Sequence, residues 1–263
     1  MSARATVRRT AQLCCTMLAL AVLSACQSTR GVPAYSESQR DKAASVNLEL
    51  GVGYLQQGNL ALAKTKLERA ETEDPHNPDV HATLGLLDER LGKSKEADKE
   101  YRTALSLKPQ DPDLLNSYAV YLCSHGRTAE GVRNFEDAAA NPLYRSPWAA
   151  YTNAGVCLRQ ATRDADAAQL FVRALQSNPA YAEAVFQASD LDFQMQKYAA
   201  ARLRIDFFLT NNAATPDLLL TGWRIARAQN DAAAAARYAQ RLTKEFPTSE
   251  QARSLAASLA NPG

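Results

Sequence analysis

Small and bulky residues recur along this 263-residue chain at a period close to 34 residues. One series of small residues, spaced 33 to 36 residues apart, is Gly51, Gly85, Ala119, Gly155, Ser189 and Gly222. A second series keeps the same phase at Ala63, Ala97, Gly131, Ala167, Ala201 and Ala234. Four positions after each of these comes a bulky residue: Leu67, Tyr101, Phe135, Phe171, Ile205 and Tyr238. Positions four apart share one face of a helix, so the pattern predicts an all-α chain of six helix pairs.

The arrangement resembles the tetratricopeptide repeat. Pro75, Pro109 and Pro179 close three of the units because proline cannot continue a helix, and Gly58 and Gly92 supply turns between helices. The resemblance implies a right-handed superhelix, an α-solenoid of six helix-turn-helix repeats in which each unit packs on its neighbours. We expect repeats at 44–77, 78–111, 112–147, 148–181, 182–214 and 215–248, followed by a C-terminal capping helix and tail at 249–263.

The first 25 residues have the features of a secretory leader. Three arginines precede a mostly apolar run that is too short to span a bilayer, which needs about 20 apolar residues. The tetrapeptide Leu23–Ser24–Ala25–Cys26 resembles a bacterial lipobox, in which diacylglycerol is attached to the cysteine and a peptidase cuts before it. We predict a lipoprotein signal peptide at 1–25 and a flexible tether, lipidated at Cys26, over 26–43. The alternative is an ordinary leader that happens to contain a cysteine.

The residue after the lipobox and the charge balance indicate where the mature chain works. Gln27, rather than Asp, follows Cys26, and by resemblance to Gram-negative sorting this favours the periplasmic face of the outer membrane. The chain has 30 Lys and Arg against 28 Asp and Glu, and loss of the three leader arginines leaves 27 against 28. This balance offers no basic surface for nucleic acid.

No enzyme signature is found in the sequence. It contains no Gly-rich phosphate loop, HExxH, GxSxG or CxxC motif. The three histidines, His76, His81 and His125, are spread over three units, and we expect none of them to be catalytic. We therefore predict a monomeric, non-enzymatic protein with no metal, no cofactor other than the lipid on Cys26, and no small-molecule substrate.

A solenoid of this kind binds partners through the inner wall formed by its first helices. Here the wall positions form an apolar strip with polar edges, which favours a partner segment such as an amphipathic helix. The alternative is that some of these side chains only pack between helices, and for Phe186, Phe193 and Trp223 we favour packing. We place the partner-binding groove in the first units, at Leu48, Val52, Leu55 and Leu86.

Residues 116–160 resemble one family in particular, the type IV pilus biogenesis lipoproteins of the PilF/PilW kind. The likeness is carried by Tyr118, Tyr121–Cys123, Gly126–Arg127, Asn141–Tyr144, Tyr151, Asn153–Gly155 and Cys157. Cys123 and Cys157 lie in this string, one repeat apart on adjacent first helices, and we predict a disulfide between them. The alternative is two small buried thiols.

The resemblance implies a function. A protein of this family is a pilotin, which binds subunits of the pilus secretin in the periplasm. Its lipid takes them to the outer membrane, where they assemble into a gated multimer. The alternative is a general outer-membrane scaffold lipoprotein that serves β-barrel assembly or peptidoglycan enzymes.

Overall fold

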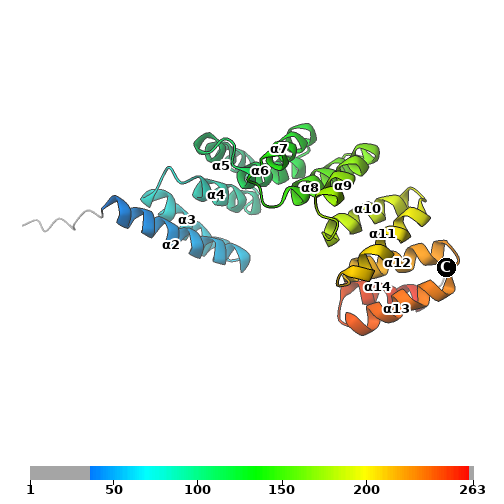
Figure 1. Cartoon of the computed structure of the whole chain (residues 1–263). Coiled ribbons are helices and arrows are strands. Elements are labelled where there is room, and N and C mark those ends of the chain that lie inside the picture. The colour runs from blue at the N-terminus through cyan, green and yellow to red at the C-terminus, as the bar shows by residue number, and fades with distance from the viewer. Residues whose placement is uncertain (1–35, 261–263) are drawn as a thin grey trace, which may run out of the picture. The chain divides into compact units, whose positions relative to one another are not determined.

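In the computed structural model, residues 36–260 are described, and every regular element in that range is an α-helix (Figure 1). The described residues divide into two units at Ala43, residues 36–43 and 44–260. The helices are α2 (Glu37–Gln56), α3 (Leu60–Glu73), α4 (Pro78–Arg90), α5 (Ser94–Leu107), α6 (Pro112–Ser124), α7 (Thr128–Ala140), α8 (Pro147–Gln160), α9 (Asp164–Ser177), α10 (Ala182–Gln194), α11 (Tyr198–Asn211), α12 (Pro216–Ala228), α13 (Ala232–Glu245) and α14 (Glu250–Ala260).

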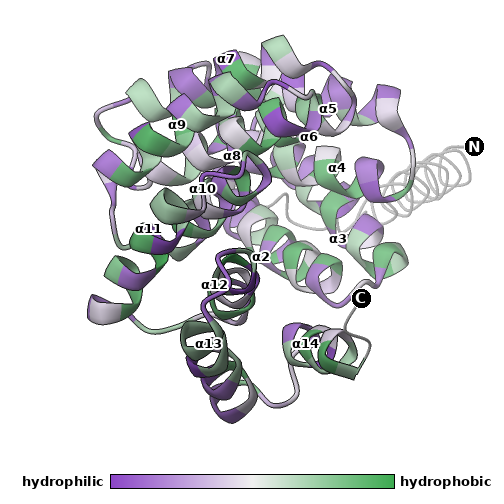
Figure 2. Cartoon of the chain, turned by 90° about the vertical axis from the view of Figure 1, so that its right-hand side faces the viewer, coloured by the Kyte–Doolittle hydropathy of each residue, from purple (hydrophilic) through white to green (hydrophobic). Residues whose placement is uncertain are grey.

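The helices of residues 44–263 pair in sequence order, which confirms the predicted all-α class and the six helix pairs. From α4 to α13, each first helix packs on the second helix of its own pair and on the next first helix along the chain. α2 packs on α3 and α4 through Leu55, which shares a core cluster with Leu67 and Leu84. α14 packs on α12 and α13. Green hydrophobic and purple hydrophilic residues alternate along these helices (Figure 2), as expected where one face of each helix is buried.

The first helix begins earlier than the repeat pattern indicated. α2 starts at Glu37, so residues 37–43 are helical, although we assigned them to the flexible tether. This segment, ESQRDKA, contains several residues with good helix propensity and neither glycine nor proline, which accounts for the difference.

The small residue of each first helix faces the bulky residue that comes 16 positions later. A methyl group at Gly155 would lie 2.4 Å from Cε1 of Phe171, and one at Gly51 would lie 2.6 Å from Cδ2 of Leu67. Both distances are shorter than van der Waals contact. The two helices can therefore pack at this spacing only because glycine has no side chain, which explains the first periodic signal in the sequence.

The third unit carries its glycine on the second helix instead. Ala119 lies on α6 opposite Phe135, and Gly131 lies at the small position of α7. A methyl group at Gly131 would come within 2.4 Å of Sγ of Cys123. The exchange of glycine and alanine therefore makes room for the cysteine.

All six turns between paired helices use the same left-handed backbone conformation. Gly58, Gly92 and Gly126 have φ of 73° to 74°. In the last three turns the equivalent residues are Thr162, Gln196 and Asn230, with φ of 56° to 61°. Glycine adopts this conformation without steric cost, whereas a β-branched threonine does not.

Side chains with oxygen acceptors begin three of the first helices. Asn77 caps α4, Asp111 caps α6 and Thr215 caps α12, each by accepting a hydrogen bond from backbone N–H groups of the first turn. A proline follows each cap, where its missing N–H is not needed. These Asx/Thr-Pro pairs place the start of each inner-wall helix at a fixed point of the repeat.

Candidate partner-binding surface

The structure separates the four residues assigned to the groove. Leu86 on α4 is 37% exposed, and Leu48 and Val52 on α2 are partly buried. Leu55 is only 2% exposed and belongs to the core cluster that also contains Leu67. The expectation that Leu55 lines the groove is therefore wrong, because its side chain is used in packing.

An apolar row continues along equivalent positions of the first four units. Val52, Leu86, Val120 and Val156 occupy the same place in α2, α4, α6 and α8, and Val120 is 47% exposed. We call these four residues the apolar row. In the fifth unit the equivalent residue is Asp190, whose carboxylate lies 3.8 Å from Arg224, and in the sixth it is Trp223, which is partly buried. The row of aliphatic side chains therefore ends after the fourth unit, where Asp190 follows.

Sequence reasoning places Val120 and Val156 on the inner wall, but it favours only residues of the first two units for the partner-binding groove. The signal was available, because each lies one repeat further along from Leu86 at 34- and 36-residue steps. Together with the disulfide, Phe135 and nearby polar side chains, Val120 and Val156 line a shallow hollow in the surface. Aliphatic side chains at this wall position therefore continue for two units beyond Leu86.

Polar side chains join each first helix to the next. The links, in order along the wall, are Arg90 Nη1 to the Leu55 carbonyl at 2.7 Å, Ser124 Oγ to Glu89 Oε1 at 3.2 Å, Asn153 Nδ2 to Asn116 Oδ1 at 3.2 Å, Arg159 Nη2 to Asp190 Oδ2 at 2.7 Å, Arg224 to Asp190, and Gln251 Nε2 to Asp217 Oδ1 at 2.6 Å. These contacts fix the spacing of the helices that present the apolar row. A wall held in this way loses little conformational freedom when it binds a partner.

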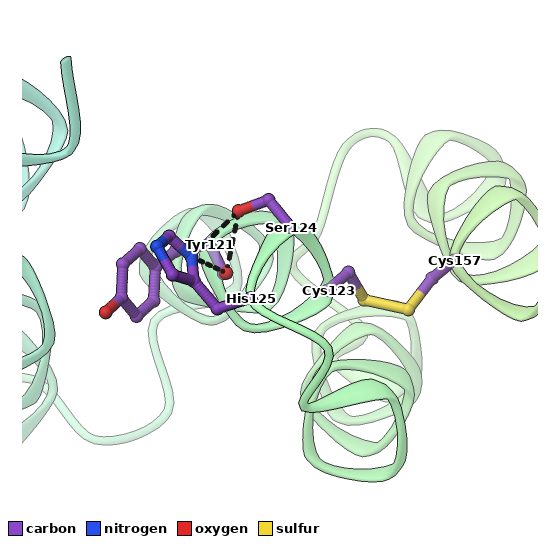
Figure 3. Close-up of a disulfide and its surroundings, with 5 residues drawn as sticks. All are labelled: Tyr121, Cys123, Ser124, His125 and Cys157. Carbon is purple, nitrogen blue, oxygen red and sulfur yellow. Dashed lines mark hydrogen bonds between the residues drawn. A yellow bond between two sulfur atoms is a disulfide. The ribbon is translucent and has the colours of Figure 1, made fainter. Parts of the chain in front are cut away.

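A covalent link adds to the polar ones between α6 and α8. Cys123 and Cys157 form a disulfide with the two sulfur atoms 2.02 Å apart and the Cα atoms 5.6 Å apart (Figure 3). It lies beside Val120 and Val156 in the hollow described above. On the other side of the same turn, Nδ1 of His125 lies 2.9 Å from the Tyr121 carbonyl and 3.1 Å from Ser124 Oγ.

The carboxylate of Asp98 on α5 ties the second repeat to the third. It accepts hydrogen bonds from the hydroxyl of Tyr118 at 2.7 Å and from Nη1 of Arg127 at 2.6 Å, and a third from Arg102 on its own helix at 2.8 Å. Burial alone would raise the pKa of Asp98, but the hydrogen bonds from Tyr118 and Arg127 outweigh it and hold that pKa below its usual range. Tyr118 and Arg127 belong to the family-like string, and this contact gives them a structural role.

The proposed lipid site, Cys26, lies outside the described residues. Within residues 36–260, none of the helices combines the length and hydrophobicity needed to cross a membrane.

Comparison with known proteins identifies the family. Two models of the tetratricopeptide repeat match residues 54–121 and 119–182. The type IV pilus assembly protein PilF of Pseudomonas aeruginosa is 30% identical over 217 residues, which is 82% of this chain and 86% of PilF. The chain belongs to the PilF family. This confirms the resemblance inferred from residues 116–160.

Solved structures of the PilF family share the fold. A structure from the functional characterisation of P. aeruginosa PilF matches with a TM-score of 0.66 at 30% identity, and covers 83% of this chain and 99% of that one. The crystal structure of PilW, described as a widely conserved type IV pilus biogenesis factor, matches with a TM-score of 0.66 at 26% identity, over 81% of this chain and 98% of PilW. The likeness to both relatives spans most of the repeat array.

Proposed function

We propose that this protein is a pilotin, an outer-membrane lipoprotein that binds subunits of the type IV pilus secretin and promotes their localisation and multimerisation. It would be needed for pilus biogenesis and twitching motility. The observation that carries the proposal is membership of the PilF family over 82% of the chain. The apolar row supports it, because a row of aliphatic side chains, two exposed and two partly buried, on a rigid wall suits an apolar segment of another polypeptide.

The proposed binding mode follows from the two halves of the wall. A partner segment would place its apolar side chains against Val52, Leu86, Val120 and Val156. In the fifth unit the next position of the row is Asp190, which pairs with Arg159 and Arg224, so the aliphatic contact would end in the fourth repeat. Because α2 to α8 are already linked to one another, the gain from burying apolar surface would not be offset by ordering of the wall.

The proposed anchor explains how binding would lead to localisation. A lipid on Cys26, with the segment that follows it, would keep the repeats close to the membrane surface. A partner held in the groove would then be held there too, at a raised effective concentration. Self-assembly of the secretin would benefit from that concentration without any chemical step by this protein.

A strain that lacks the gene tests the proposal. We expect secretin monomers to accumulate and heat- and detergent-resistant multimers to be lost, with loss of twitching. Reintroduction of the wild-type gene should restore both. Leu86→Asp should restore neither, because a carboxylate in the middle of the apolar row opposes burial. Immunoblots of membrane fractions measure monomers and multimers directly.

The matched control is Leu203→Asp on α11. Leu203 is 72% exposed and lies on a second helix, away from the inner wall, so this variant makes the same chemical change at another surface leucine. It should complement the deletion fully. Intact secretin multimers in the deletion strain would refute the pilotin role. A general defect of outer-membrane β-barrel proteins would favour the scaffold alternative.

A further inference from the structure

A histidine and two glutamates meet between the first and second repeats, away from the apolar row. Glu71 lies on α3, His81 on α4 and Glu100 on α5. Each offers one ligand atom, and the three atoms lie within 4.8 Å of one another. The side chains of His81 and Glu100 are only 7% and 14% exposed. The cluster is therefore a largely buried set of one imidazole and two carboxylates drawn from three helices.

The hydrogen bonds of His81 direct one of its nitrogen atoms at the carboxylates. Nε2 lies 3.0 Å from the Pro75 carbonyl, which can only accept, so Nε2 carries a proton. Nδ1 lies 2.7 Å from Oε2 of Glu100. In a metal-bound histidine, one ring nitrogen usually binds the metal and the other donates its N–H to a carbonyl or carboxylate. His81 has this arrangement, because Nε2 donates to a backbone carbonyl and Nδ1 is directed at the carboxylates.

The charges around the cluster leave the two carboxylates poorly balanced. Among the described residues, no hydrogen bond or ion pair is assigned to the Glu71 carboxylate. The nearest cation to Glu100 other than His81 is Lys99, 3.9 Å away and 80% exposed. Two carboxylates that converge on one nitrogen in a partly buried place favour a metal cation between them.

We propose that Nδ1 of His81 and the carboxylates of Glu71 and Glu100 bind a divalent transition metal ion of the Zn²⁺ type. One nitrogen and two carboxylate oxygens form a ligand set that Zn²⁺ accepts, with water completing the coordination. The bonds of about 2.0 to 2.2 Å require the three ligand atoms to adjust by small side-chain rotations. The rotation of Glu71 breaks no described contact.

Metal bound here would join α3 of the first repeat to α4 and α5 of the second. The first two repeats supply Val52 and Leu86 of the apolar row, so the ion would stabilise the start of the inner wall. It binds the folded arrangement of three helices and not the unfolded chain, and therefore should raise the melting temperature.

Calorimetric titration of the purified protein with Zn²⁺ alone tests the site. We expect one saturable site and a rise in melting temperature with Zn²⁺ concentration, both reversed by a chelator. Glu71→Gln should weaken the affinity at least about tenfold, the lower limit known for loss of an outer-shell partner. This variant keeps the size of the side chain and removes no described contact, so its fold should be unchanged. His81→Gln should abolish the site.

Two matched controls make the same changes outside the cluster. Glu96→Gln alters a surface carboxylate one turn before Glu100 on α5, and His76→Gln alters the exposed histidine of the preceding loop. Both should bind Zn²⁺ like the wild type. Bound Co²⁺ should give visible absorption that the His81→Gln variant lacks. Absence of saturable binding to the wild type, or equal binding by Glu71→Gln and Glu96→Gln, would overturn the proposal.

Discussion

At the scale of single residues, the turn positions show how the repeat tolerates imperfect sequences. The left-handed turn is kept in all six units, but only Gly58, Gly92 and Gly126 suit it fully. Thr162 adopts the same conformation with φ of 57°. Its branched side chain crowds the backbone there, and only the packing of the helices on either side keeps it in place.

Replacing Thr162 by glycine should therefore stabilise the protein. The left-handed conformation costs a non-glycine residue about 1 to 2 kcal/mol, and part of the gain is offset because glycine is more flexible in the unfolded chain. We expect Thr162→Gly to raise the free energy of unfolding by roughly 1 kcal/mol, measured by urea denaturation. Asn230→Gly is the control with a smaller expected gain, since asparagine tolerates this region. A loss of stability in Thr162→Gly would contradict the account.

These turns also show what the sequence reveals at this scale. Gly58 and Gly92 indicated their turns directly, because glycine between two periodic segments has few other uses. Thr162, Gln196 and Asn230 gave no such signal. Their backbone conformation follows from the helices that they connect. The left-handed turn could therefore be predicted only from the position of these residues in the repeat, and not from the residue types.

At the scale of elements, contacts between neighbouring helices are set by side chains that the periodic pattern does not specify. The pattern of small and bulky residues predicted which helices pair, but the links between repeats come from residues such as Arg90 and Asp98. Leu55 illustrates the consequence. Arg90 of α4 donates a hydrogen bond to its carbonyl, and the Leu55 side chain packs in one cluster with Val80 of α4, so Leu55 lies where α2 meets the next repeat and not on open surface.

The Asp98 contact between repeats two and three predicts a specific dependence on pH. The pKa of Asp98 is below the ordinary value of about 3.9, so its stabilising effect is complete above that pH and is lost as the pH falls toward the folded-state pKa. We expect Asp98→Asn to be less stable than the wild type at pH 7, because Tyr118 and Arg127 lose a charged acceptor. The difference should shrink below about pH 4.

Thermal unfolding of both proteins between pH 7 and pH 2 measures this difference. Arg127 also donates to Glu130, so it keeps one ionic partner in the Asp98→Asn variant. A difference in melting temperature that stays constant across this range would show that the charge of Asp98 is not the source of its stabilising effect.

At the scale of the whole molecule, the chain combines a repeat array with a start that has the features of a lipoprotein leader. The array could be predicted from spacing, since each unit packs mainly on its neighbours and repeats one pattern. How far each wall side chain is exposed could not be predicted from spacing, because that exposure depends on how successive first helices are rotated against one another. That rotation is fixed by the links between helices and by the disulfide of Cys123 and Cys157.

In the proposed function the lipid on Cys26 anchors the protein and the repeat array binds the partner. A change at Cys26 should therefore affect anchoring alone. Only a cysteine thiol can form the thioether to diacylglycerol, so Cys26→Ser should leave the repeats folded but release them from the membrane fraction. Cys15→Ser is the matched control, because the same change falls in the leader before the lipobox and should leave the protein at the membrane. Fractionation followed by immunoblotting measures both.

Because a lipid contributes location and the apolar row contributes binding, Cys26→Ser should still capture secretin subunits while it fails to deliver them. Retention of Cys26→Ser at the outer membrane would mean that protein contacts hold the chain there.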